Sequence, residues 1–342
     1  MKVIEARNAH NMYPEALRQM RLFGKERDSR NGPVTKFDGP CTLLYNRPEE
    51  RVVFWRERDA NPFFHLLESL WMLAGRNDVA YPAGIVKTMV DFSDDGRTYN
   101  GAYGYRWRKH FGRDQLFLII DALRKNPDCR RQVLTMWDAR HDLGLQSRDL
   151  PCNLQALFQV NDDGALDMMV TNRSNDLVWG ALGANAVHFS VLQEFVARAL
   201  GRPVGRYWQT SFNMHLYTDR HKELLTALKD EEANPMTGKR PWNPYEIAGI
   251  KPYPLMDSDD AQCWLEDLDM WMNEGVLVGL RNSFFRRVAH PMAMAHRHWQ
   301  TGKGLERYDG ALEILQQVQA TDWRLAAEDW IDRRRRKYLE RK

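Results

Sequence analysis

The stretch RDLPCNLQALFQVNDDGALDMMVTNRSND, residues 148–176, contains two apolar runs joined by a polar turn. The first run, LQALFQVND (154–162), ends in the turn sequence Asn-Asp-Asp-Gly, and ALDMMVTNRSND (165–176) follows that turn directly. Short apolar runs on both sides of such a turn are typical of a β-hairpin. We therefore predict a hairpin, with Cys152 placed after Pro151 at the head of its first strand.

Further strands and helices are predicted on both sides of this hairpin. The apolar patterns predict strands over 39–46, 51–57, 130–138 and 204–217, and helices over 12–24, 62–75, 114–126 and 184–201. After Tyr217 the pattern becomes mostly helical, and we expect 232–342 to form a helical C-terminal extension. Strands mixed with helices, some of the strands adjacent in sequence, indicate a single α/β or α+β domain over 1–342.

Composition narrows the class of protein. The chain has 342 residues, 43% of them hydrophobic, and a net charge of +3. Its four cysteines form no CxxC pair, which favours a reducing compartment and disfavours a disulfide framework or a zinc cluster. The sequence shows no signal peptide and no apolar run long enough for a membrane span. We expect a cytoplasmic protein with no membrane partner and no bound metal.

Short motifs suggest two other classes of function. The tail RRRRKYLERK (333–342) is basic, as in nucleic-acid binders, but a basic run at a chain end is more often a solvated helix face, and the overall charge is balanced. His290, His296 and His298 lack the spacing and the cysteines of a structural metal site. A non-catalytic nucleotide-binding scaffold is a third alternative.

Several residue types near the hairpin favour chemistry. Cys152 is either a small buried residue or a nucleophile whose thiolate is favoured by nearby arginines. Arg173 and Ser174 together suit a phosphate dianion, since a guanidinium and a hydroxyl both donate hydrogen bonds to it. Glu68, inside an apolar helix, is either a surface carboxylate or a group that transfers protons. His215 and Tyr217 are two residues apart on a strand and share a face, which suits sugar hydroxyls or an ordinary core edge.

Six segments in this order resemble the thymidylate synthase and nucleotide hydroxymethylase superfamily. They extend from about Arg30 to Tyr217 and are HLLESLWMLAGRND, YNGAYGYRW, NPDCRRQVLTMWD, LPCNLQALFQV, NRSNDLVWG and FNMHLY. The resemblance implies the three-layer α/β sandwich of that family, with a mixed sheet at the interface of a homodimer. It also implies a pyrimidine nucleoside monophosphate as substrate and 5,10-methylenetetrahydrofolate as co-substrate, with no metal.

The resemblance assigns roles residue by residue. Catalytic roles fall on Cys152 as the nucleophile, on Glu68 for proton transfer, and on Tyr103 and Asp176. Nucleotide binding falls on residues that would hold the phosphate, the sugar or the base: Arg30, Arg130, Arg131, Arg173, Ser174, Ala184, Asn185, His215 and Tyr217. Arg130 and Arg131 would act in the site of the partner subunit. Folate binding falls on Asp176, Gly180, Met89 and Phe92.

The sequence departs from thymidylate synthases in three places, and these departures favour hydroxymethylation. GALGAN (180–185) replaces the base-reading segment, with Ala184 at the expected spacing and Asn185 one position later. The tryptophan pair that lines the folate site is replaced by VKTMVDFSDDG (86–96), and the chain ends in Arg and Lys. We interpret the pattern as a cytidylate-type 5-hydroxymethylase. Alternatives are a deoxyuridylate hydroxymethylase and a methylating enzyme, with the base, the sugar and the product left open. His141 is a further candidate near the sugar.

Overall fold

The computed structural model describes residues 1–233, 243–275 and 277–341. A six-stranded mixed sheet forms its centre, in the order β1 (Lys2–Ala6), β4 (Cys41–Tyr45), β9 (Val204–Ser211), β7 (Leu166–Asn172), β6 (Asn153–Val160) and β5 (Val133–Thr135). The β1–β4 and β7–β9 pairs are parallel and the others antiparallel. The β6–β7 hairpin is confirmed, with Val160 opposite Leu166 across its turn.

A second, four-stranded sheet lies beside the first. Its order is β2 (Lys25–Ser29), β3 (Gly32–Lys36), β10 (Met214–Tyr217) and β8 (Asn175–Asp176). The predicted strand over 204–217 is therefore divided between the two sheets, as β9 and β10. Because β8 and β10 continue from β7 and β9, this small sheet places Asp176 opposite His215.

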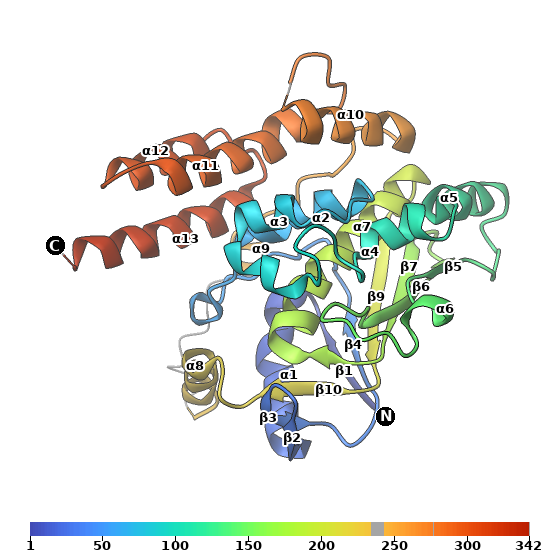
Figure 1. The fold of residues 1–342 in the computed structure, drawn as a ribbon, viewed down its shortest axis with the longest axis horizontal. Helices are drawn as coiled ribbons and strands as arrows, with labels where there is room; N and C mark the ends of the chain where they lie inside the picture. Colours follow the sequence, from blue (N-terminus) through green and yellow to red (C-terminus); the bar gives the residue numbers. More distant parts are fainter. Residues whose placement is uncertain (234–242, 276, 342) are drawn as a thin grey trace.

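Helices cover one face of the large sheet (Figure 1). Helix α7 (Asn185–Ala199) packs on β7 and β9, α1 (Ala9–Phe23) packs on β1 and β4, and α2 (Pro62–Leu73) packs on α7. The other described helices are α3 (Ala80–Ile85), α4 (Tyr103–Tyr105), α5 (Gln115–Lys125), α6 (Ala139–Asp142), α8 (Lys222–Ala233), α9 (Pro244–Ile247), α10 (Ala261–Glu274), α11 (His290–Thr301), α12 (Glu306–Leu315) and α13 (Thr321–Leu339). The predicted α+β class and the mixed sheet are confirmed; the sheet's place in a dimer interface stays a prediction.

The predicted strand over 51–57 is wrong. This segment is irregular and leads into a 3₁₀ turn, Arg56–Arg58. Its polar groups bond to α1 instead of to a strand: the Phe54 N–H donates to Nδ1 of His10, and the Trp55 indole donates to the His10 carbonyl. The neighbouring strand β4 is already paired on both sides, so it offers no free edge to a strand here.

The C-terminal extension is helical, as predicted, in its described part. Helix α13 packs on α2 and α12, and the Trp330 ring lies 5.7 Å from that of Phe63 and 4.8 Å from that of Trp299. In Figure 1 helices α10–α13 lie together beyond α2 as seen from the sheet. None of the described helices is both long and apolar enough to cross a membrane. The cytoplasmic location stays a prediction.

Candidate active site

Cys152 directly follows Pro151 and immediately precedes Asn153, the first residue of β6. Its backbone N–H donates to the Tyr103 hydroxyl at 3.1 Å, and its carbonyl accepts from the Arg173 N–H at 2.9 Å. The Arg173 guanidinium donates to the carbonyls of Pro151 (2.8 Å) and Leu150 (3.1 Å). Burial raises the pKa of the Cys152 thiol, and the positive charge of Arg173 opposes that rise. The predicted nucleophile and phosphate-binding arginine therefore lie side by side.

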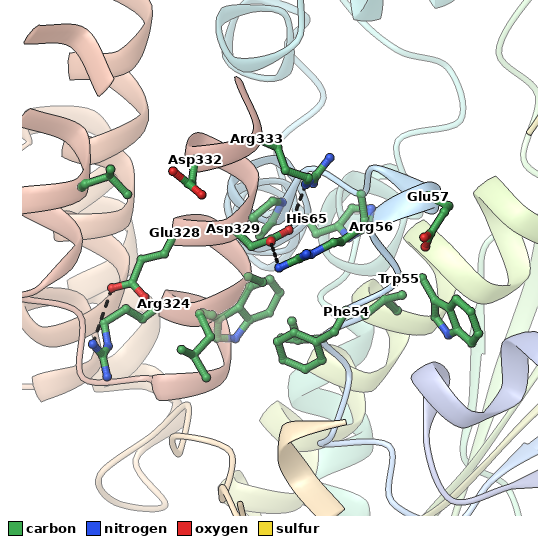
Figure 2. Close-up of a pocket in the computed structure, with 18 of the residues that line it drawn as sticks. Phe54, Trp55, Arg56, Glu57, His65, Arg324, Glu328, Asp329, Asp332 and Arg333 are labelled. Atoms are coloured by element: carbon green, nitrogen blue, oxygen red, sulfur yellow. Dashed lines mark hydrogen bonds and ion pairs between the residues drawn. The ribbon is translucent and has the colours of Figure 1, made fainter. Parts of the chain in front are cut away.

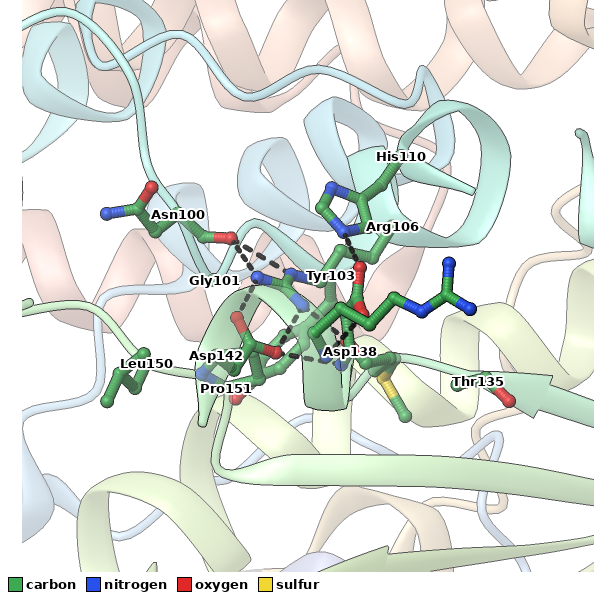
Figure 3. A network of polar contacts seen from close by, with 12 residues as sticks. Asn100, Gly101, Tyr103, Arg106, His110, Thr135, Asp138, Asp142, Leu150 and Pro151 are labelled. Carbon is green, nitrogen blue, oxygen red and sulfur yellow. Dashed lines mark hydrogen bonds and ion pairs between the residues drawn. The ribbon is translucent and has the colours of Figure 1, made fainter. Parts of the chain in front are cut away.

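Tyr103 is held by a buried ion pair (Figure 3). Arg106 and Asp142 are joined by two contacts of 2.7 Å, and both side chains are fully buried. The same guanidinium donates to the carbonyls of Asn100 and Met136. A buried ion pair is tolerated when further hydrogen bonds satisfy its remaining donors, as they do here. It ties the loop before Tyr103 to the segment after β5, so that the Tyr103 hydroxyl faces the head of β6.

The sugar and phosphate candidates gather at the small sheet. The rings of His215 and Tyr217 lie 5.3 Å apart on one face of β10, as predicted. Arg30 is exposed in the turn between β2 and β3, and that turn adjoins Tyr217 through Asn31, at 3.5 Å from the tyrosine hydroxyl. Ser174 is half-buried directly before β8. These residues therefore lie around one end of the Cys152 hairpin.

Asp176 caps the start of a π-helical segment, Leu177–Ala184, by accepting a hydrogen bond from the Trp179 N–H. Its Oδ2 is buried without a hydrogen-bond partner among the described residues. A buried carboxylate oxygen needs a donor, and the ring N–H groups of a pterin are donors of that kind. Gly180 is required for packing, since a Cβ there would lie 2.3 Å from Oδ1 of Asn175.

The π-helical segment brings Asn185, rather than Ala184, to the head of β6. Gly183 in this segment has non-helical backbone angles (φ −113°, ψ −107°), and α7 starts at Asn185. Oδ1 of Asn185 accepts from Nδ2 of Asn153 at 3.2 Å, and Asn153 directly follows Cys152. No side-chain contact of Ala184 with this region is found among the described residues. This placement supports the one-residue shift that the sequence left open, and Asn185 as the residue that contacts the base stays a prediction.

Glu68 pairs with His188, a residue that the sequence analysis did not single out. Oε2 of Glu68, on α2, lies 3.1 Å from Nε2 of His188, on α7. In the described structure neither atom has a well-aligned hydrogen bond, although both are buried. His188 is three residues after Asn185 and so lies on the same side of α7. A histidine within the apolar run ANAVHFSVL was the signal that could have identified it.

The remaining candidates lie outside this cluster. Met89 and Phe92 belong to a 3₁₀ segment, Lys87–Phe92, which is followed by Asp94; that carboxylate contacts Ser147 and the Arg148 N–H, just before Cys152. Met89 is partly buried and Phe92 is exposed. They lie near the loop that precedes Cys152, and no contact among the described residues joins them to the cysteine.

The arginine pair and the loop histidine are on the surface. Arg130 and Arg131 are exposed in a turn before β5, so the strand predicted over 130–138 is shorter than expected and does not include them. No contact in the described part of the chain joins either of them to Cys152. His141 is exposed on α6, its ring 5.5 Å from that of His110.

A separate cavity of about 970 Å³ lies between residues 52–65 and helices α12 and α13 (Figure 2). Arg56 and Asp329 pair across it at 2.8 Å, whereas Arg324 and Glu328 pair along α13 at 3.5 Å. Of the predicted site residues none lines it. We therefore assign the chemistry to the Cys152 cluster.

Comparisons with known proteins identify the family of the chain. A sequence model of the family described as thymidylate synthase matches residues 11–240. The chain is 56% identical, over 100% of its length and 97% of the relative's, to a deoxyuridylate hydroxymethyltransferase of Pseudomonas phage M6. It is 37% identical to the protein of that name from Bacillus phage SP01, over 55% of this chain and 51% of the relative. A thymidylate synthase of Corynebacterium aurimucosum is 28% identical over 63% of this chain and 81% of that protein.

Proposed function

The chain belongs to the thymidylate synthase family, and we propose that it hydroxymethylates C5 of dUMP with 5,10-methylenetetrahydrofolate as the one-carbon donor. The observation that carries this proposal is the cluster of Cys152, Arg173, Asp176 and Asn185 at the head of β6. The choice of uracil is supported by the relative from Pseudomonas phage M6, whose name specifies deoxyuridylate and which matches the whole chain. The cytidylate substrate preferred from the sequence alone becomes the second candidate.

Cys152 is the proposed nucleophile. Its thiolate adds to C6 of the base, which interrupts the ring conjugation and makes C5 nucleophilic. Arg173 favours the thiolate by its charge and also suits the phosphate, together with Ser174. Tyr103 accepts the Cys152 backbone N–H and so fixes the approach of the sulfur. The folate supplies the one-carbon unit, and Asp176 is the residue that would hold its pterin, because Oδ2 is a buried acceptor without a partner in the described structure.

The Glu68–His188 pair is the proposed site of water activation. The C5 proton and the folate must leave to give an exocyclic methylene, and a hydroxymethyl product then requires a water to add to that carbon and lose a proton. A carboxylate and an imidazole 3.1 Å apart and shielded from solvent can accept and return this proton. Elimination of the Cys152 sulfur from C6 restores the ring and the free enzyme. Asn185, one turn away on α7, would contact the base itself, because an amide offers both a donor and an acceptor to N3 and O4.

We also propose that two copies pack through the large sheet. The helices cover one face of the sheet, whereas Met169, Val133 and Phe212 are exposed on or beside the strands. A second copy would cover them, and it would bring its Arg130 and Arg131 to the phosphate held by Arg173. A phosphate dianion removed from water needs several charge-assisted donors.

The test is incubation of the protein with isotope-labelled methylenetetrahydrofolate and, in turn, dUMP, dCMP, UMP and CMP. Mass spectrometry of each product gives the base, the sugar and the oxidation level of the new group. We expect label in a 5-hydroxymethyl group on dUMP, and none with the Cys152→Ala variant. A methyl product, or turnover of a cytidine nucleotide in preference to dUMP, would refute the proposal.

A further inference from the structure

Five buried side-chain amides, with Asn185 in the middle, form a continuous chain of hydrogen bonds. They are at most 8% exposed and come from four strands and a helix: Gln209, Asn175, Asn185, Asn153 and Asn172. We call this set the amide relay. Each contact is a hydrogen bond between neighbouring amides, from Gln209 at one end to Asn172 at the other. The relay includes Asn153, the residue that directly follows Cys152.

A backbone carbonyl fixes the direction of the relay. Nε2 of Gln209 donates to the Ala181 carbonyl at 3.1 Å, and a carbonyl can only accept. Oε1 of Gln209 therefore faces Asn175 and accepts from its Nδ2. An amide has one donor side and one acceptor side, so this choice sets the orientation of every amide that follows.

The direction reaches Asn185 through two further bonds. Oδ1 of Asn175 accepts from Nδ2 of Asn185 at 3.0 Å, and Oδ1 of Asn185 accepts from Nδ2 of Asn153 at 3.2 Å. Reversing the Asn185 amide alone would place oxygen against oxygen and N–H against N–H. In the buried relay those unmade hydrogen bonds oppose the reversal. Asn185 retains one N–H and one lone pair outside the relay, on fixed sides.

We propose that the amide relay locks the Asn185 amide in one orientation and thereby restricts the enzyme to one pyrimidine base. Uracil presents an acceptor at C4 and a donor at N3, and cytosine presents the reverse. A freely rotating amide can match either base by turning over, whereas a locked amide matches one. This inference rests on the proposed function, in which Asn185 contacts the base, and it makes Gln209, Asn175 and Asn153 positioning residues.

The decisive variant is Gln209→Met, which removes the anchor while keeping a similar volume. The Ala181 carbonyl keeps its hydrogen bond from the Tyr45 hydroxyl at 2.9 Å. Among the described residues every remaining partner is then an amide or the Ser211 hydroxyl, and these can reverse together. Turnover of dUMP and dCMP is measured separately as kcat/KM. We expect the ratio between the two bases to fall by at least about tenfold, because use of the disfavoured base increases.

The control is Ser211→Ala, which removes a buried hydroxyl beside the relay but leaves the Gln209 anchor; its ratio should stay as in the wild type. Asn175→Ser interrupts the relay one residue closer to Asn185 and should lower the ratio as Gln209→Met does. It supplies the test if the methionine variant does not fold. Only an increase in kcat/KM for the disfavoured base supports the inference, because a damaged site would lose activity with both bases.

Two outcomes separate this inference from the proposed function. If the wild type prefers dCMP, the proposed substrate is wrong, and the relay is still supported when the variants lose that preference. If the variants fold and keep the wild-type ratio, the relay does not control base selection. Equal use of both bases by the wild type would also overturn the inference.

Discussion

The proton affinity of Cys152 is set by two opposing influences, burial and the charge of Arg173. Because burial prevails and raises the thiol pKa, the free enzyme should hold the sulfur mainly protonated at pH 7. Alkylation of Cys152 by iodoacetamide should therefore accelerate as pH rises through and beyond about 8.5, the usual range for a thiol. Arg173→Gln should move the midpoint of this profile to still higher pH.

The other thiols must be separated from Cys152 in that experiment. Cys129 has a lowered pKa, because backbone and side-chain N–H groups of Arg131 and Gln132 bond its sulfur, and would react first. Burial raises the pKa of Cys41 to about 12, which makes it inert. The profile is therefore measured in a background with Cys129→Ser and Cys263→Ser. A midpoint below that of an ordinary thiol would show that the arginine outweighs burial.

The proposed role of His188 in proton transfer can be tested by measuring kcat and KM separately. His188→Gln keeps a similar size but removes the base, so proton transfer from water should slow while nucleotide binding persists. We expect kcat for the hydroxymethyl product to fall by about 100-fold with little change in KM for dUMP. His298→Gln, a half-buried histidine on α11 outside the Cys152 cluster, is the control. A rise in KM without a change in kcat would contradict this role.

At the scale of the element, the π-helical segment Leu177–Ala184 explains why sequence spacing left Asn185 undecided. The motif NRSNDLVWG predicts roles for Asp176 and Gly180, but counting onward from Gly180 places Ala184 where the base-reading residue is expected. A π turn absorbs one extra residue without a mark in hydrophobic periodicity, as it does here before α7. Gly180 and Gly183 are the features of the sequence that indicate an irregular backbone in this segment.

Strands were predictable where their side chains form an apolar pattern bounded by a turn sequence. The β6–β7 hairpin was identified from its turn and its apolar alternation. Strand β2, KERDS, is exposed at every position and was missed, because only its backbone pairing with β3 makes it a strand. The apolar run 51–57 was wrongly predicted as a strand, because its partner in space is a helix.

Gly104 is the position where α4 depends on the absence of a side chain. A Cβ there would lie 1.8 Å from the carbonyl oxygen of Met72, which is backbone and cannot turn away. Gly104→Ala should push α4 off α2 and lower the free energy of unfolding by at least about 2 kcal/mol. Because Tyr103 would move with α4, activity should fall as well. Gly39→Ala, where no atom lies within 4 Å of the new Cβ, should have a negligible effect in the same denaturant titration.

At the scale of the whole molecule, the basic C-terminal helix α13 forms ion pairs within the chain that stabilise the fold. Arg333 and Arg334 bind Asp59, Arg335 binds Asp309 and Arg336 binds Asp332, at 2.6–2.9 Å. The Asp59 contacts tie α13 to the start of the segment that leads into α2. Arginines that are already paired within the chain offer less to a nucleic-acid phosphate. We propose that the extension is part of the catalytic domain, as predicted, rather than a separate binding module.

Shared active sites predict that two inactive variants complement each other. In a homodimer whose sites combine Cys152 of one subunit with Arg130 of the other, Cys152→Ala and Arg130→Ala are each defective. A hybrid of the two has one site with an intact cysteine and an intact arginine. Random mixing should therefore restore up to about a quarter of wild-type turnover, since half of the dimers are hybrids with one working site each.

The hybrid experiment requires subunit exchange, which tags of two kinds on the variants can verify. Cys152→Ala mixed with Arg173→Ala is the matched control, because Arg173 contacts the cysteine loop of its own chain. In that hybrid the subunit with the intact cysteine lacks its own Arg173, so each site has a defect and no recovery is expected. Recovery in both mixtures, or in neither once hybrids are verified, would show that Arg130 does not act across the interface.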